Sequence, residues 1–111
     1  LLKAVGERMR ARLPVQAFLA RQGGDEFTVL VEDLPDASAA EQLARALLEA
    51  FATPIEVRGH EVRVTPSIGI ALFPEHAERP EDLMRCADAA MYAAKAAGRN
   101  TWRLFHADMA S

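Results

Sequence analysis

A pair of adjacent glycines near the start of the chain constrains the predicted fold more than any other feature of the sequence. Gly23 and Gly24 lie between two largely apolar stretches, at residues 15–22 and 27–32. Glycine adopts positive φ angles without steric cost, and a two-residue hairpin turn requires such angles. The sequence therefore predicts two strands over these stretches, joined by a tight turn in which the glycines supply the positive φ angles.

Two acids, Asp25 and Glu26, follow the glycines directly. Magnesium in proteins is held by one or two carboxylates, with water and phosphate oxygens completing its coordination. A glycine backbone also lets a ligand approach closely, because no side chain stands in the way. The pattern fits a divalent cation that carries a polyphosphate. On local sequence alone, however, such a pattern is more often a solvated hairpin turn without any ligand.

Length, charge and cysteine content exclude several classes of protein. The chain has 111 residues, which allows at most one domain, and its formal net charge of −3 argues against general binding to nucleic acid. The single cysteine, Cys86, cannot form an internal disulfide, and its apolar helical surroundings predict a buried structural thiol. Because no apolar run reaches membrane-spanning length and no signal peptide is recognised, we expect a cytoplasmic segment. A longer parent chain could still be anchored in a membrane.

The first segment predicts a helix that lacks an N-cap residue. Apolar residues spaced by three and four over residues 1–13 are typical of a helix, which Pro14 would end. No Ser, Thr, Asp or Asn precedes Leu1 as an N-cap. We therefore expect the sequence to open inside a helix, with a further segment upstream.

The middle of the chain predicts a helix, a small hairpin and a third long strand. Ser38 and Glu41 have the spacing of a capping box, so we expect an amphipathic helix to begin there. Alternating residues over 55–64 predict a hairpin, and residues 65–73 predict a strand. Within that strand, Gly69 would allow another backbone to approach closely.

Two histidines lie in the predicted loops. His60 falls in the turn of the small hairpin and His76 in a polar loop. A lone histidine in such a place is usually solvated rather than a ligand. We therefore expect both side chains to be exposed and without a function.

The last long helix is predicted from Pro80 to about residue 97, with Gly98 as its stop. Four polar residues on it are spaced by four, three and four, so they should share one face: Asp88, Tyr92, Lys95 and Arg99. Basic residues at a helix C-terminus also complement the helix dipole, which is the simplest structural interpretation of the last two. A final strand is predicted over residues 101–105.

Three stretches resemble the GGDEF family of diguanylate cyclases. Residues 23–27 read GGDEF and follow Arg21, as in the family signature. Residues 67–71, SIGIA, and residues 87–100, ADAAMYAAKAAGRN, are similar to two further family motifs in the same order. Together these motifs extend over most of the chain.

The resemblance implies a fold, a reaction and partners. The fold would be an α/β (α+β) ferredoxin-like palm, shared with class III nucleotide cyclases, with a largely antiparallel sheet flanked by helices. The reaction would condense two GTP molecules into cyclic di-GMP with release of pyrophosphate, using Mg²⁺ or Mn²⁺. Each of two domains would hold one GTP, which makes a homodimer part of the mechanism.

The resemblance also implies a set of site residues. Asp25 and Glu26 would be catalytic and would bind the metal. Gly23 and Gly24 would lie against the nucleotide. The terminal phosphates would be held by Lys95 and Arg99.

The chain departs from the family at its start. Family members carry a preceding strand with another metal-binding aspartate, and an Asn and an Asp that recognise guanine, none of which precedes Leu1. We therefore expect residues 1–105 to be a truncated domain that is inactive alone and has a raw sheet edge where the central strand is absent. Residues 106–111 are expected to be a linker to a following domain, for example an EAL-type phosphodiesterase. The family's inhibitory product site is expected to be absent, because residues 14–17 carry neither of its charges.

Three functions remain open from the sequence. The first is a working cyclase, which the intact Asp25 and Glu26 favour. The second is a GTP-binding regulatory module that controls a linked EAL-type phosphodiesterase without making product. The third is a ferredoxin-like interaction domain with no ligand.

Overall fold

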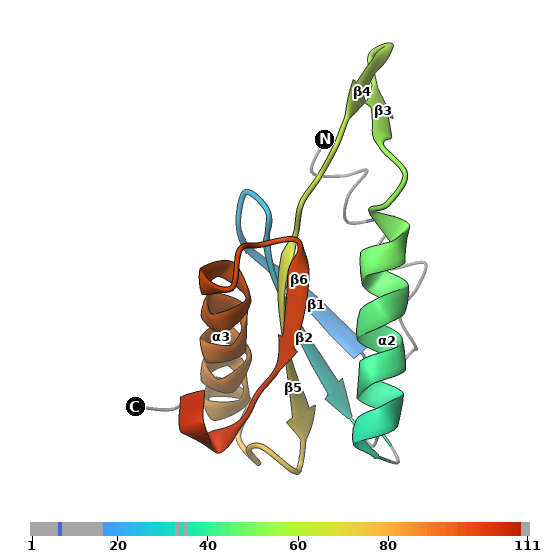
Figure 1. The fold of residues 1–111 in the computed structure, drawn as a ribbon. Helices are drawn as coiled ribbons and strands as arrows, with labels where there is room; N and C mark the ends of the chain where they lie inside the picture. Colours follow the sequence, from blue (N-terminus) through green and yellow to red (C-terminus); the bar gives the residue numbers. More distant parts are fainter. Residues whose placement is uncertain (1–6, 8–16, 33, 35, 110–111) are drawn as a thin grey trace.

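The computed structural model describes Glu7, residues 17–32, Leu34 and residues 36–109 (Figure 1). The helix predicted over residues 1–13 lies outside the described residues apart from Glu7, which is helical. The first three positions of the product site at residues 14–17 also lie outside them, so the predicted absence of that site stays a prediction.

A sheet of four strands forms the centre of the described chain and has a helix on each face (Figure 1). Its order is β1-β2-β5-β6. The strands are β1 (Ala17–Gly23), β2 (Glu26–Glu32), β5 (Ser67–Phe73) and β6 (Thr101–Leu104). The helices are α2 (Ala37–Ala50) and α3 (Pro80–Ala96), and the smaller elements are the hairpin of β3 (Ile55–Val57) with β4 (His60–Val62) and the 3₁₀ turn η1 (Ala107–Met109). Within the described chain, no helix is both long enough and apolar enough to cross a membrane.

The α/β class with flanking helices is confirmed, but the sheet is mixed rather than largely antiparallel. Strand β1 pairs with β2 antiparallel, whereas β2 with β5 and β5 with β6 are parallel. The long connections explain the directions, because α2 and the small hairpin join β2 to β5, and α3 joins β5 to β6. Since β2 and β5 pair along their whole length, the raw edge expected in the middle of the sheet is not found among the described strands.

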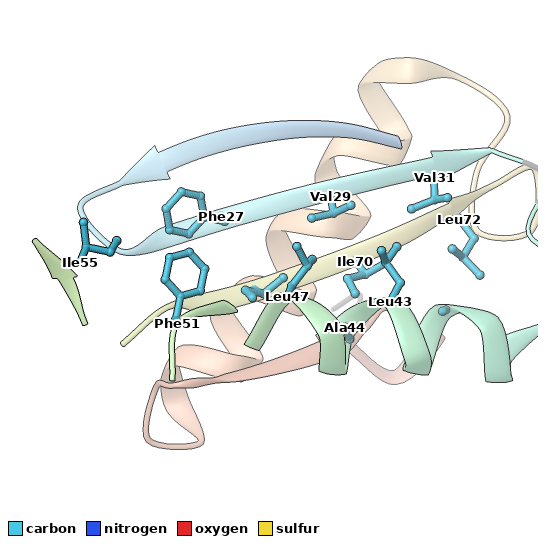
Figure 2. Packing of buried hydrophobic residues seen from close by; sticks show 12 residues of the cluster. Phe27, Val29, Val31, Leu43, Ala44, Leu47, Phe51, Ile55, Ile70 and Leu72 are labelled. Carbon is cyan, nitrogen blue, oxygen red and sulfur yellow. The ribbon is translucent and has the colours of Figure 1, made fainter. Parts of the chain in front are cut away.

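The main core lies between α2 and the sheet (Figure 2). Alternate residues of β2 point into it, so Phe27, Val29 and Val31 are almost fully buried. The ring of Phe27 stacks against that of Phe51, with 6.4 Å between the centroids. Because Phe27 is anchored in this core, its neighbours Glu26 and Thr28 point to the opposite face, toward α3.

Helix α2 begins earlier than the sequence predicts. Its N-cap is Asp36, whose Oδ1 accepts a hydrogen bond of 2.9 Å from the backbone N–H of Ala39. Ser38 is already inside the helix. Aspartate and serine are about equally favoured as N-caps, and capping at Asp36 makes both Ala37 and Ser38 helical.

His76 is part of the structure and is not the solvated loop residue that the sequence predicts. Its Nδ1 accepts a hydrogen bond of 2.9 Å from the backbone N–H of Leu72. Its ring meets that of Phe105 edge-on, with 5.3 Å between the centroids. Burial lowers the pKa of His76 below its usual value of 6.5, and nearby His106 lowers it further against the opposing effect of Glu75.

We expect His76 to make the stability of the fold fall on acidification. A histidine whose pKa is lower in the folded state stabilises the fold fully above its unfolded value of 6.5, and this contribution is lost as the pH falls through 6.5 toward the folded pKa. Protonation also places an N–H on Nδ1, which then faces the N–H of Leu72. The urea midpoint of the wild-type chain should therefore drop between about pH 7.5 and about pH 5.5 more than that of His76→Gln.

His60, which is exposed and lies at the start of β4 rather than in the predicted turn, offers the control for this experiment. His60→Gln should keep the pH dependence of the wild-type chain. Equal slopes for the wild-type chain and His76→Gln would show that the His76 ring does not accept a hydrogen bond in the folded state.

Candidate functional site

The turn between β1 and β2 is tight, but its glycines do not have the predicted backbone. Gly23 pairs with Glu26, and neither Gly23 nor Gly24 has a positive φ; among the described glycines only Gly59 and Gly98 do. The prediction of a left-handed turn was therefore wrong. Gly23 instead leaves room for the carboxylate of Glu26, because a Cβ on Gly23 would lie only 2.9 Å from Oε1 of Glu26.

The two acids of this turn each contact a basic residue from the far end of the chain. Lys95 Nζ donates a hydrogen bond of 2.5 Å to Oε2 of Glu26, and Arg99 Nη1 lies 3.5 Å from Oδ2 of Asp25. The partners are 69 and 74 residues apart in the sequence. The structure thus brings together the four charged residues that the sequence selected.

The end of α3 determines how these basic side chains are presented. The helix stops at Ala96, and Gly98, Arg99 and Asn100 follow with positive φ angles. Arg99 therefore lies in the turn after the helix and not on the helical face on which the sequence placed it. Tyr92, predicted on that face too, is 64% exposed.

A glycine in β5 fixes the position of α3 over the sheet. A Cβ on Gly69 would lie 2.1 Å from the carbonyl oxygen of Ala87 and 2.3 Å from the nitrogen of Met91. The predicted close backbone approach at Gly69 is confirmed. At the start of the same strand, the backbone N–H of Ser67 donates a hydrogen bond of 2.8 Å to the carbonyl of Asp25, which ties the acidic turn to β5.

Asp88 belongs to the surroundings of the site, although no role was predicted for it. Burial raises its pKa, and the neighbouring charge of Glu26 raises it further. Its Oδ1 is buried and has no hydrogen-bond partner in the structure, and the same holds for Oγ of Ser67. The spacing of Asp88 from Lys95 along α3, two turns on one face, was the signal available in the sequence.

The structure gives no comparable role to Cys86. The thiol is half-buried and packs beside Leu83 and Ala87 on α3, and burial raises its pKa. A raised pKa keeps the thiol protonated, which opposes a role as nucleophile.

The acidic turn suits a magnesium or manganese ion that has further ligands besides the protein carboxylates. Asp25 and Glu26 supply carboxylate oxygens, the ligand type that such ions prefer. In the described part of the chain, no group of three or more His, Cys, Asp and Glu residues could hold a metal ion. The buried unpaired oxygens of Asp88 and Ser67 show that polar groups without a protein partner border the site. The residues therefore fit an ion held partly by water and phosphate rather than by a complete protein cage.

The described chain is an α/β domain in which an acidic hairpin turn faces a basic helix end, and comparisons with known proteins assign this domain to a family. Residues 1–101 match the family described as diguanylate cyclase, GGDEF domain. Since this match extends over most of the chain, the protein belongs to the GGDEF family.

Relatives and solved structures support this assignment. The chain is 46% identical over 109 residues to the bifunctional diguanylate cyclase/cyclic di-GMP phosphodiesterase MucR of Pseudomonas aeruginosa, covering 98% of this chain and 16% of MucR. It is 39% identical over 105 residues to the diguanylate cyclase TpbB of the same species, covering 94% of this chain and 24% of TpbB. The crystal structure of the TpbB (YfiN) GGDEF domain matches with a TM-score of 0.79 and 39% identity, covering 92% of this chain and 64% of that one. The chain thus spans about a quarter or less of these curated relatives.

Proposed function

We propose that this chain forms the acidic and phosphate-binding part of a diguanylate cyclase domain, which condenses two GTP molecules into cyclic di-GMP and pyrophosphate. The observation that carries this proposal is the pairing of Asp25 and Glu26 with Arg99 and Lys95. A metal–triphosphate complex needs anionic ligands beside cationic ones, and this cluster offers both. MucR and TpbB, which carry diguanylate cyclase in their names, add support from relatives.

Each residue of the cluster has a role in the proposal. Asp25 and Glu26 hold Mg²⁺ or Mn²⁺, and Asp25 also helps to activate the attacking 3′-hydroxyl. Lys95 and Arg99 hold the terminal phosphates. Gly23 and Gly24 lie against the nucleotide. When bound, the metal ion neutralises phosphate charge and polarises the phosphoryl group.

The reaction joins two nucleotides, so the proposal includes a second copy of the domain. Each copy holds one GTP, and the two copies face each other as a homodimer. What the protein contributes is chiefly alignment of the two substrates and charge compensation, because phosphoryl chemistry of this kind needs little covalent help.

A second candidate is a regulatory module that binds GTP without turning it over. Two relatives favour it: NbdA of P. aeruginosa and PdeR of Escherichia coli are named cyclic di-GMP phosphodiesterases, and each is 38% identical to this chain. In such an arrangement residues 106–111 would lead to the phosphodiesterase domain.

A chimaera tests the proposal directly. Residues 1–101 of this chain replace the matched part of the TpbB GGDEF domain, and the product from GTP and Mg²⁺ is measured by chromatography. We expect cyclic di-GMP from the chimaera, none from the 111-residue chain alone, and at least about a 100-fold loss of rate for Glu26→Gln in the chimaera. A chimaera that binds GTP without making product supports the regulatory module, and one that does not bind GTP supports a ligand-free interaction domain.

A further inference from the structure

We infer that the four charged residues of the site rest in a self-paired state, and that a metal ion and a polyphosphate enter by exchanging partners with it. The inference rests on the proposed function for the class of ligand. In the resting state Glu26 pairs with Lys95 and Asp25 with Arg99. In the bound state the carboxylates face the cation and the basic residues face the phosphates, so each of the four side chains keeps a partner of opposite charge.

These two pairs are more shielded from water than other ion pairs in the described chain. The side chains of Lys95 and Glu26 are 34% and 20% exposed, and those of Arg99 and Asp25 are 50% and 28% exposed. In the surface pair of Arg45 with Glu41, by comparison, the side chains are 69% and 49% exposed. Shielding from water strengthens a charge interaction and makes an unpaired charge costlier, so the resting pairs of the site resist separation more than surface pairs do.

Because the four charges balance, a metal ion alone or a polyphosphate alone competes poorly with the resting ion pairs. Asp25 and Glu26 together carry two negative charges, and Lys95 and Arg99 carry two positive charges, so the group is neutral. A polyphosphate without metal must take Lys95 from Glu26 and leave that carboxylate without a cation. A bare cation has the opposite problem, because it leaves Lys95 unpaired. Each ligand therefore lowers the cost of binding for the other, and this coupling is reciprocal.

Binding of inorganic tripolyphosphate without metal tests the exchange. The 111-residue chain and its variants are titrated by calorimetry in the presence of EDTA, after circular dichroism has shown that they are folded. Glu26→Gln releases Lys95 and should bind tripolyphosphate roughly 10-fold more tightly than the wild-type chain. Asp88→Asn, like Glu26→Gln, replaces a carboxylate of the site by an amide, but it breaks no ion pair. Its affinity for tripolyphosphate should therefore rise by less than about 3-fold.

The reciprocal experiment uses Mn²⁺ alone, followed by its paramagnetic resonance signal. Lys95→Gln should bind Mn²⁺ roughly 10-fold more tightly than the wild-type chain. Arg85→Gln makes the same charge change on α3, but Arg85 pairs with Asp82 and not with the acidic turn, so its affinity should stay near the wild-type value.

The outcomes separate this inference from the proposed function. Equal gains for Glu26→Gln and Asp88→Asn would reveal only a long-range charge effect and would overturn the exchange. If Glu26→Gln leaves the affinity for tripolyphosphate unchanged, the exchange is overturned as well, while the proposed function stands. If neither the wild-type chain nor any variant binds tripolyphosphate, both the exchange and the phosphate-binding role of Lys95 and Arg99 are wrong.

Discussion

Gly69→Ala is expected to destabilise the fold by about 3 kcal/mol, at the upper end of the range for overpacked cores. The added Cβ would lie 2.1 Å from the carbonyl oxygen of Ala87 and 2.3 Å from the nitrogen of Met91. Both are backbone atoms of α3, so no side chain can rotate away to make room. The helix or the strand must move as a whole, which also disturbs the packing of α3 on β2 and β5.

Urea denaturation measures this effect, and Gly24→Ala is its matched control. A Cβ on Gly24 would meet nothing within 4 Å, and Gly24 does not have a positive φ. We therefore expect Gly24→Ala to change the free energy of unfolding by no more than about 0.5 kcal/mol, or to stabilise the fold slightly. A loss below about 1 kcal/mol for Gly69→Ala would mean that α3 does not lie against β5 as closely as the structure places it.

The local parts of the fold could be predicted from the sequence because they depend on neighbouring residues. Pro80 and Gly98 gave the limits of α3 to within a residue or two, since proline fixes a helical φ in the first turn and glycine readily adopts the positive φ that follows a helix end. The close approach at Gly69 was also predicted, because a glycine within an apolar strand often marks a place where another backbone lies close. That Asp25 and Arg99 belong to one site, by contrast, came from the family resemblance, since periodicity does not reach across 74 residues, and their direct contact was not predicted.

The errors of the sequence analysis arise from particular packing contacts and chain connections that local patterns do not specify. His76 was predicted to be solvated, but Phe105, far along the chain, packs against its ring. Gly23 was assigned a positive φ because hairpin turns commonly need one, whereas here its lack of a side chain makes room for Glu26. Strand directions in the sheet followed from the connections that α2 and α3 make, which local patterns do not specify.

Removing both basic residues of the site, in Lys95→Ala with Arg99→Ala, should lower the affinity for Mg²⁺–GTP roughly 100-fold or more. Hydrogen bonds to charged groups are worth about 1.5–3 kcal/mol each, so two of them contribute about 3–6 kcal/mol. Calorimetry on the TpbB chimaera measures the affinity, and urea denaturation measures the stability of the same variant. The double variant Arg79→Ala with Arg85→Ala removes the same charge from exposed positions near the start of α3 and should leave the affinity within about 3-fold of the unsubstituted chimaera.

The same pair of measurements decides between the two interpretations of these basic residues. If Lys95 and Arg99 only complement the dipole at the end of α3, the double variant should lose up to about 1 kcal/mol of stability and keep its affinity for Mg²⁺–GTP. If they hold phosphates, affinity falls much further than stability does. Their resting partners point to the second outcome, because Lys95 and Arg99 reach away from the helix end to the carboxylates of Glu26 and Asp25. An unchanged affinity would leave the acidic turn without a phosphate-binding partner and would remove the basis for assigning a nucleotide to it.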